Sequence, residues 1–237
     1  MFRHVLAILM LAAALGCTTG TAVTPAVFVP ISAHTPITHL PAEELIYPED
    51  FTYLGAFRLP EGSDRPYTFA YGGAAMTWIP GDPGSENCLP GSLLVMGHNR
   101  MPYGELPDGN KAAVITIPQP VISRSLDDLN RASIIRDFHA VDFWFPHFDE
   151  IPTVGMEYLD GLRDPGIHIS WGQHFHDEEF QVPTHAWYAL DGTDIQGPWV
   201  MGDYSAYSTN SYIFSIPPEW ADEHVSGRLL AAGRFRD

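Results

Sequence analysis

The sequence predicts an all-β fold, and three features of the chain support that prediction. Short apolar runs of strand length recur from about residue 53 to the C-terminal end. Clusters of turn-forming residues separate these runs, in a chain that holds 21 glycines and 21 prolines. One strand-and-turn pattern also returns later in the chain. Many short strands with regular turns are typical of β-sandwiches, β-barrels and β-propellers.

Each candidate strand combines apolar or β-branched residues with a bounding glycine, proline, aspartate or asparagine. The strands are predicted at 53–59, 73–79, 92–98, 112–117, 132–138, 154–159, 167–171, 184–190, 199–202, 211–216 and 228–235. Turn clusters such as 80–84, 106–110 and 190–194 supply the backbone conformations that tight turns need, so they mark strand ends.

An internal echo favours a β-propeller. The run 114–118, Val-Ile-Thr-Ile-Pro, returns 99 residues later at 213–217 as Ile-Phe-Ser-Ile-Pro. A helical turn is predicted after each copy, with Ser125 as the N-cap of the first and Pro218 opening the second. Gly227 can end the second turn.

The spacing of the echo sets the expected number of blades. A blade has about 40–50 residues, so the distance between the two copies corresponds to about two blades. The predicted domain, 46–237, is long enough for about four blades. Four blades form either a complete small ring or part of a larger, incomplete one. The alternative is a β-sandwich that contains two similar strands.

The residues before position 46 are predicted to lie outside this domain. Residues 1–16 join a basic start to a short apolar run, the pattern of a secretory signal peptide. The residues before Cys17 resemble the lipobox of bacterial lipoproteins, which implies acylation of Cys17. Residues 17–45 contain four prolines and predict an extended linker. The alternative is an ordinary secretory signal with a chance cysteine.

Charge and cysteine content limit the possible partners. The formal net charge of −17 repels nucleic acid and anionic lipid. The acidic residues are scattered, which indicates a solvated surface more than one cation site. Cys17 and Cys88 are the only cysteines, so no disulfide framework is predicted.

Residues 166–180 contain the highest concentration of side chains that could take part in catalysis or metal binding, with three histidines and three consecutive acidic residues. Alternation in a strand places Ile167, Ile169 and Trp171 on one face and His168 and Ser170 on the other. This pattern predicts a half-buried strand, and the alternative for its polar residues is a solvated strand-to-loop edge.

If the extended backbone continues, further polar residues join the face of His168. The resulting row of His168, His174, His176 and Glu178 suits a divalent metal, zinc or calcium. Asp177 and Glu178 could instead act as the acid and base of a glycosidase. No Gly-x-Ser-x-Gly or phosphate-binding glycine loop is present, so no reaction is named and enzymatic activity stays open.

Other candidates are ligand-binding residues at strand ends or in aromatic clusters. His98 and Arg100 follow the strand 92–98, and Trp144 lies in the aromatic run 142–148. Trp199 and Tyr207 belong to a second aromatic group with small polar neighbours. The alternative for each is a hydrogen-bonded strand end or a buried aromatic residue.

Three segments, 51–60, 197–222 and 227–237, resemble parts of secreted bacterial β-propeller-like lipoproteins. No assigned activity accompanies this likeness, so it implies only the fold and the cellular location. Together with the lipobox it implies a bacterial cell-envelope protein, anchored by lipid and facing the periplasm or the exterior.

Three functions fit these observations. The first is a lipid-anchored β-propeller that binds a glycan, a small ligand or a protein partner. The second is an extracytoplasmic hydrolase that uses the histidine and acidic cluster at 168–179. The third is an assembly scaffold at the membrane.

The lipobox is tested by the substitution Cys17→Ser, which removes the thiol that would be acylated. We expect the wild-type chain in the membrane fraction with the mass of an attached lipid, and the variant without either property. Cys88→Ser leaves the lipobox intact and should behave as wild type. An equal distribution of all three proteins would contradict the prediction.

Overall fold

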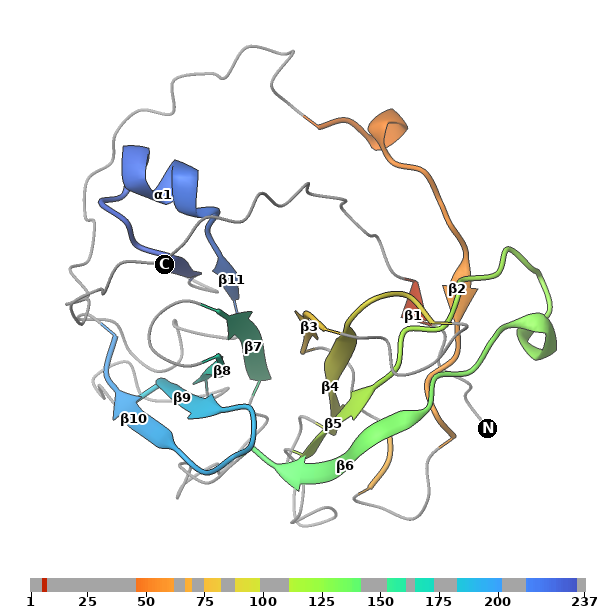
Figure 1. The fold of residues 1–237 in the computed structure, drawn as a ribbon, viewed down its shortest axis with the longest axis horizontal. Coiled ribbons are helices and arrows are strands. Elements are labelled where there is room, and N and C mark those ends of the chain that lie inside the picture. The colour runs from red at the N-terminus through yellow and green to blue at the C-terminus, as the bar shows by residue number, and fades with distance from the viewer. Residues whose placement is uncertain are drawn as a thin grey trace.

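The computed structural model describes residues 6–7, 46–61, 67–69, 75–81, 88–98, 111–141, 153–160, 165–172, 183–201 and 212–233. Within these ranges the chain is mostly β and forms four antiparallel sheets, which confirms the all-β prediction (Figure 1). No sheet formed by these residues closes on itself.

Two four-stranded sheets make up the centre of the fold. The first has the order β3-β4-β5-β6, and the second has the order β10-β9-β8-β7. Their strands are β3 (Met76–Ile79), β4 (Ser92–His98), β5 (Lys111–Ile115), β6 (Ile134–Ala140), β7 (Thr153–Leu159), β8 (Gly166–Gly172), β9 (His185–Ala189) and β10 (Ile195–Trp199). Each strand pairs with its neighbour in the chain, so both sheets are antiparallel meanders.

The remaining elements are short. Two-stranded sheets pair β1 (Leu6–Ala7) with β2 (Ala56–Phe57) and β11 (Ile213–Ser215) with β12 (Leu230–Ala232). The helices are the 3-10 turns η2 (Pro48–Asp50) and η3 (Leu126–Asp128) and the α-helix α1 (Pro218–His224). None of the helices in the described ranges is long and apolar enough to cross a membrane. β1 lies in the predicted signal peptide, which itself stays a prediction.

Ten of the eleven predicted strands overlap an observed strand over most of the observed length, whereas the prediction at 199–202 was wrong. The strand there is β10, which ends at Trp199 and contains Gly197 and Pro198. Proline cannot donate to a ladder, and β10 tolerates it because it is the edge strand of its sheet.

Both copies of the internal echo form the same local motif, a strand, a helical turn and an antiparallel strand. Ser125 caps η3 as predicted, because its Oγ accepts a hydrogen bond from the Asp127 N–H at 3.3 Å. Pro218 opens α1, and Gly227 donates its N–H to the Ala221 carbonyl at 2.8 Å.

The two copies hold different places in their sheets, however. β5 is the third strand of a four-stranded sheet, whereas β11 pairs only with β12 among the described strands. The echo is therefore a repeated hairpin, and it does not by itself define a repeat of whole sheets.

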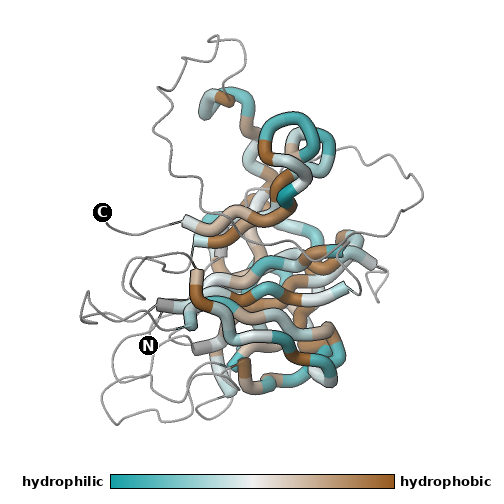
Figure 2. The backbone as a smooth tube through the Cα atoms, turned by 90° about the vertical axis from the view of Figure 1, so that its left-hand side faces the viewer, coloured by the Kyte–Doolittle hydropathy of each residue, from teal (hydrophilic) through white to brown (hydrophobic). Residues whose placement is uncertain are grey.

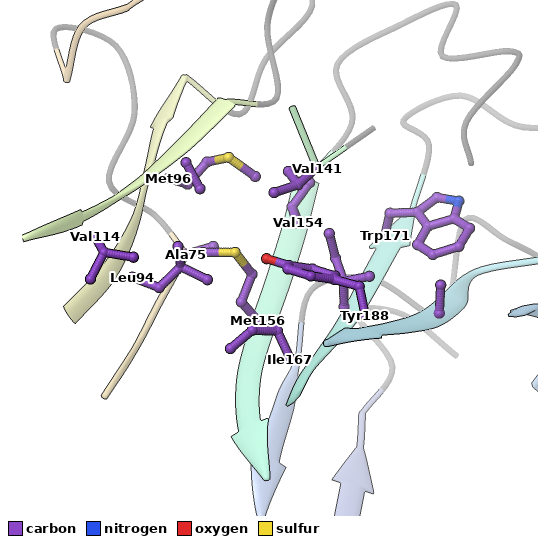
Figure 3. Packing of buried hydrophobic residues seen from close by; sticks show 13 residues of the cluster. Ala75, Leu94, Met96, Val114, Val141, Val154, Met156, Ile167, Trp171 and Tyr188 are labelled. Atoms are coloured by element: carbon purple, nitrogen blue, oxygen red, sulfur yellow. The ribbon is translucent and has the colours of Figure 1, made fainter. Parts of the chain in front are cut away.

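The main core cluster lies between the two four-stranded sheets (Figure 3). Leu94 and Met96 of β4 meet Val154, Ile167 and Tyr188 of the second sheet, and all five are at most 2 % exposed. Hydrophobic and hydrophilic residues alternate along parts of the strands (Figure 2).

The first sheet is buried on its other face as well. There Val95 and Ile115 pack with Phe57 and Ile117 in a second cluster. Burial on both faces explains the continuous apolar run of β4, Leu93 to Met96.

The inner edge strands of three sheets lie side by side, and the sheets extend outward from them (Figure 1). β7 contacts both β3 and β11. The Glu157 carboxylate on β7 connects all three, accepting the Ser215 N–H at 3.0 Å and the Thr77 hydroxyl at 3.4 Å. Farther out, the Arg136 guanidinium of β6 donates to the Leu190 carbonyl, which joins the two large sheets a second time.

A test of this packing uses two glycines with positive φ. Gly55 has φ +123°, and a Cβ there would lie 2.6 Å from the Val121 backbone, which bonds to Ala56 in both directions. Gly81 has φ +147° and nothing within 4 Å of its Cβ position. We expect Gly55→Ala to lower the free energy of unfolding by roughly 1–3 kcal/mol more than Gly81→Ala does, because only the first forces backbone apart.

Urea unfolding of both variants measures this difference. Equal losses at the two positions would contradict the close approach of residue 55 to residue 121.

Candidate functional site

The second large sheet has one apolar face in the core and one face that carries polar and aromatic side chains. Cross-strand register defines this second face, because residues directly opposite one another in antiparallel strands share a face. His168 lies opposite Glu157 and Trp187, and Ser170 lies opposite His185. Trp199 of β10 pairs with His185, after a register shift between Gln196 and Trp199. We call Glu157, His168, Ser170, His185, Trp187 and Trp199 the histidine face.

The predicted alternation of β8 is confirmed. Ile167, Ile169 and Trp171 belong to the core cluster, and His168 and Ser170 point the other way. The half-burial was correct for His168, which is partly exposed, but not for Ser170, which is only 1 % exposed. Within its sheet β8 lies between β7 and β9 and is not an edge strand. The alternative of a solvated strand-to-loop edge is therefore also wrong for 166–172.

Three buried polar atoms on the histidine face lack a hydrogen-bond partner. They are Nε2 of His168, Nε2 of His185 and Oγ of Ser170. His185 is 4 % exposed, and its Nδ1 lies 2.9 Å from Oγ1 of Thr184. Buried polar atoms nearly always have a partner, so three neighbouring exceptions mark this face as a candidate binding surface.

Burial also sets the charge of the two histidines. It lowers the pKa of His168 to about 4. It lowers the pKa of His185 to about 4 as well, with a smaller contribution from the neighbouring His168. Both imidazoles are therefore neutral at pH 7, and each can bind a metal or exchange hydrogen bonds with a ligand.

Exposure of the aromatic residues changes across the face. Trp187 is 7 % exposed, and its indole covers Gly166, where a Cβ would collide with the ring. Trp199, on the edge strand, is 41 % exposed. The face is thus closed over β8 and β9 and accessible at β10.

The Glu157 carboxylate already accepts hydrogen bonds from Thr77 and Ser215, so its role is structural.

Among the described residues, two of those singled out from sequence lie on the histidine face: His168 on β8 and Trp199 on β10, with β9 between them. For His98 the backbone at the end of β4 is described but the side chain is not. The other candidates lie outside the described residues: Cys17, Arg100, Trp144, His174, His176, Asp177, Glu178 and Tyr207. Across the described ranges no group of three or more His, Cys, Asp or Glu side chains is placed to hold a metal.

His185 was missed by sequence reasoning. Its strand, His-Ala-Trp-Tyr-Ala, is buried along most of its length, so no alternation distinguishes the histidine. The only signal is its register opposite Ser170, which places it beside His168. That register belongs to the sheet and cannot be read from either strand alone.

Comparison with known proteins gives no relative: no family model, curated protein or solved structure matches the chain.

The lowered pKa values predict how stability depends on pH. As pH falls from about 6.5 to about 4, the unfolded chain binds protons at His168 and His185 that the folded chain does not, so stability falls in that window. Each histidine contributes on the order of 3 kcal/mol to this loss. His185→Leu should lose less stability than wild type between about pH 7 and about pH 4.5, as measured by urea unfolding.

The matched control is His224→Leu on α1, whose side chain is 46 % exposed. It should show the same pH dependence as wild type. His139, whose pKa is also lowered by burial, is present in all three proteins and cancels in the comparison. If His185→Leu follows the wild-type pH dependence, burial of a neutral imidazole at this position is refuted.

Proposed function

We propose that this chain is a binding protein of the bacterial cell envelope, built as part of a β-propeller, that takes up a neutral glycan at the Trp199 end of the histidine face. The observation that carries the binding role is the exposed indole of Trp199 opposite the buried His185 on one sheet face. Ligand sites commonly combine an aromatic wall with a few polar groups that fix orientation.

The propeller part of the proposal is supported by the arrangement of the sheets. β3, β7 and β11 are the inner strands, Glu157 connects them, and the larger sheets follow as antiparallel meanders that extend outward. Propeller blades are four-stranded sheets arranged in this way around a common axis. The proposed location in the cell envelope is supported by the lipobox-like residues at Cys17 and the signal-like residues before them.

Charge and side-chain chemistry favour a neutral glycan as the ligand. The net charge of −17 disfavours anionic ligands. A sugar ring offers C–H groups that pack on an indole and hydroxyls that both donate and accept hydrogen bonds. The indole of Trp199, which is 41 % exposed, supplies the surface on which those C–H groups can pack.

The proposal is tested by calorimetric titration with neutral oligosaccharides, such as cellohexaose, chitohexaose and maltohexaose. At least one should bind, and Trp199→Ala should weaken that binding about tenfold, the effect of losing roughly 1.4 kcal/mol of stacking. Trp220→Ala is the matched control, because Trp220 is also an exposed tryptophan, at 50 %, but lies on α1.

The outcomes separate the candidate functions. Equal weakening in both variants, or no binding by any of these sugars, would refute the glycan proposal. Cleavage of a bound oligosaccharide would favour the hydrolase predicted from residues 168–179 instead.

A further inference from the structure

We propose that His168 and His185 together bind one divalent transition-metal ion of the zinc type through their Nε2 atoms, with the Ser170 hydroxyl beside it. This site differs from the row predicted from sequence, because its second histidine comes from β9. It does not depend on the glycan proposal, since it rests on the buried part of the face and not on Trp199.

The register places the two imidazoles within reach of one ion. His185 is directly opposite Ser170, and His168 is two residues from Ser170 on β8, so the histidines are diagonal neighbours on one face. Diagonal neighbours have Cβ atoms about 7–8 Å apart. Two imidazole rings that lean toward each other can span that distance with a metal about 2.0–2.1 Å from each Nε2.

The missing hydrogen bonds are the main observation. Nε2 of both histidines and Oγ of Ser170 are buried without a partner, while Ser170 and His185 are 1 % and 4 % exposed. A buried polar atom without a partner costs about 1–3 kcal/mol. Three such atoms in adjacent register positions are explained together if one bound species contacts all of them.

The surroundings of His185 support a metal over other species. Its Nδ1 lies 2.9 Å from the Thr184 hydroxyl, and Thr184 is itself 1 % exposed. When Nδ1–H donates to that hydroxyl, Nε2 carries the lone pair, and it is the buried ring nitrogen without a partner. Metal-binding histidines are oriented by such a hydrogen bond from the other ring nitrogen.

The chemistry of the ligands selects the ion. A metal binds imidazole through the unprotonated lone pair of a ring nitrogen, and the Nε2 atoms of His168 and His185 have no hydrogen-bond partner that would occupy it. Imidazole nitrogen suits zinc, copper and nickel, whereas calcium and magnesium prefer oxygen. Within the described residues no third His, Cys, Asp or Glu joins the two histidines.

The test is zinc binding to the purified full chain after chelator treatment and removal of the chelator. We expect about one zinc ion per chain by elemental analysis, together with a higher melting temperature as zinc is added. His168→Gln and His185→Gln should each weaken zinc binding at least tenfold, and His224→Gln on α1 should leave it unchanged.

Two outcomes would overturn the proposal. One is the absence of stoichiometric zinc with no shift in melting temperature, which would assign the face to a buried water or to no bound species. The other is full zinc binding by both glutamine variants, which would place the ion on other histidines of the chain.

A measurement on the wild-type chain tests the proposal even if the variants fail to fold. Electron paramagnetic resonance of one equivalent of Cu²⁺ should show splitting from two imidazole nitrogens. Loss of the two-nitrogen signal in the presence of excess Zn²⁺ would show that both ions use one site, and a signal with no imidazole nitrogen would refute the proposal.

Discussion

Face-to-face packing of two antiparallel sheets is the constraint on which the rest of this structure depends. Leu94 and Met96 of one sheet and Ile167 and Ile169 of the other are at most 1 % exposed. Burying a side chain of this kind contributes about 1.5–3 kcal/mol. Because the first sheet is covered on both faces, β4 carries apolar residues at successive positions, and the second sheet directs its polar residues away from this core.

Polar interactions then fix how the sheets are arranged around the centre. Glu157 accepts hydrogen bonds from residues of β3 and β11 while it belongs to β7, so one carboxylate holds three inner strands together. The Arg136 guanidinium connects the two large sheets at their outer side. With both the inner and the outer side joined, the second sheet is held in place relative to its neighbours, and Trp199 keeps its position opposite His185.

The candidate site shows where sequence reasoning succeeded and where it failed. Alternation correctly separated His168 from Ile167 and Ile169, because the period of a strand is a property of the local backbone. The burial of Ser170 was missed, since it depends on β8 lying between two other strands. His185 was missed for the same reason, because a residue 17 positions from His168 becomes its neighbour only through strand register. The same applies to the strand at 199–202, where an edge position allowed Pro198 into β10.

The sequence by itself determined the fold class, the approximate places of most strands, and the helical turns that begin at Ser125 and Pro218. Those features follow from local patterns of apolar, proline and glycine residues, which act over a few positions. Only the tertiary structure decided which edge strands lie side by side, which faces are buried, and that His168 Nε2, Ser170 Oγ and His185 Nε2 are buried without a hydrogen-bond partner. These depend on contacts between residues far apart in the chain, because the burial and pKa of a side chain are set by what packs against it.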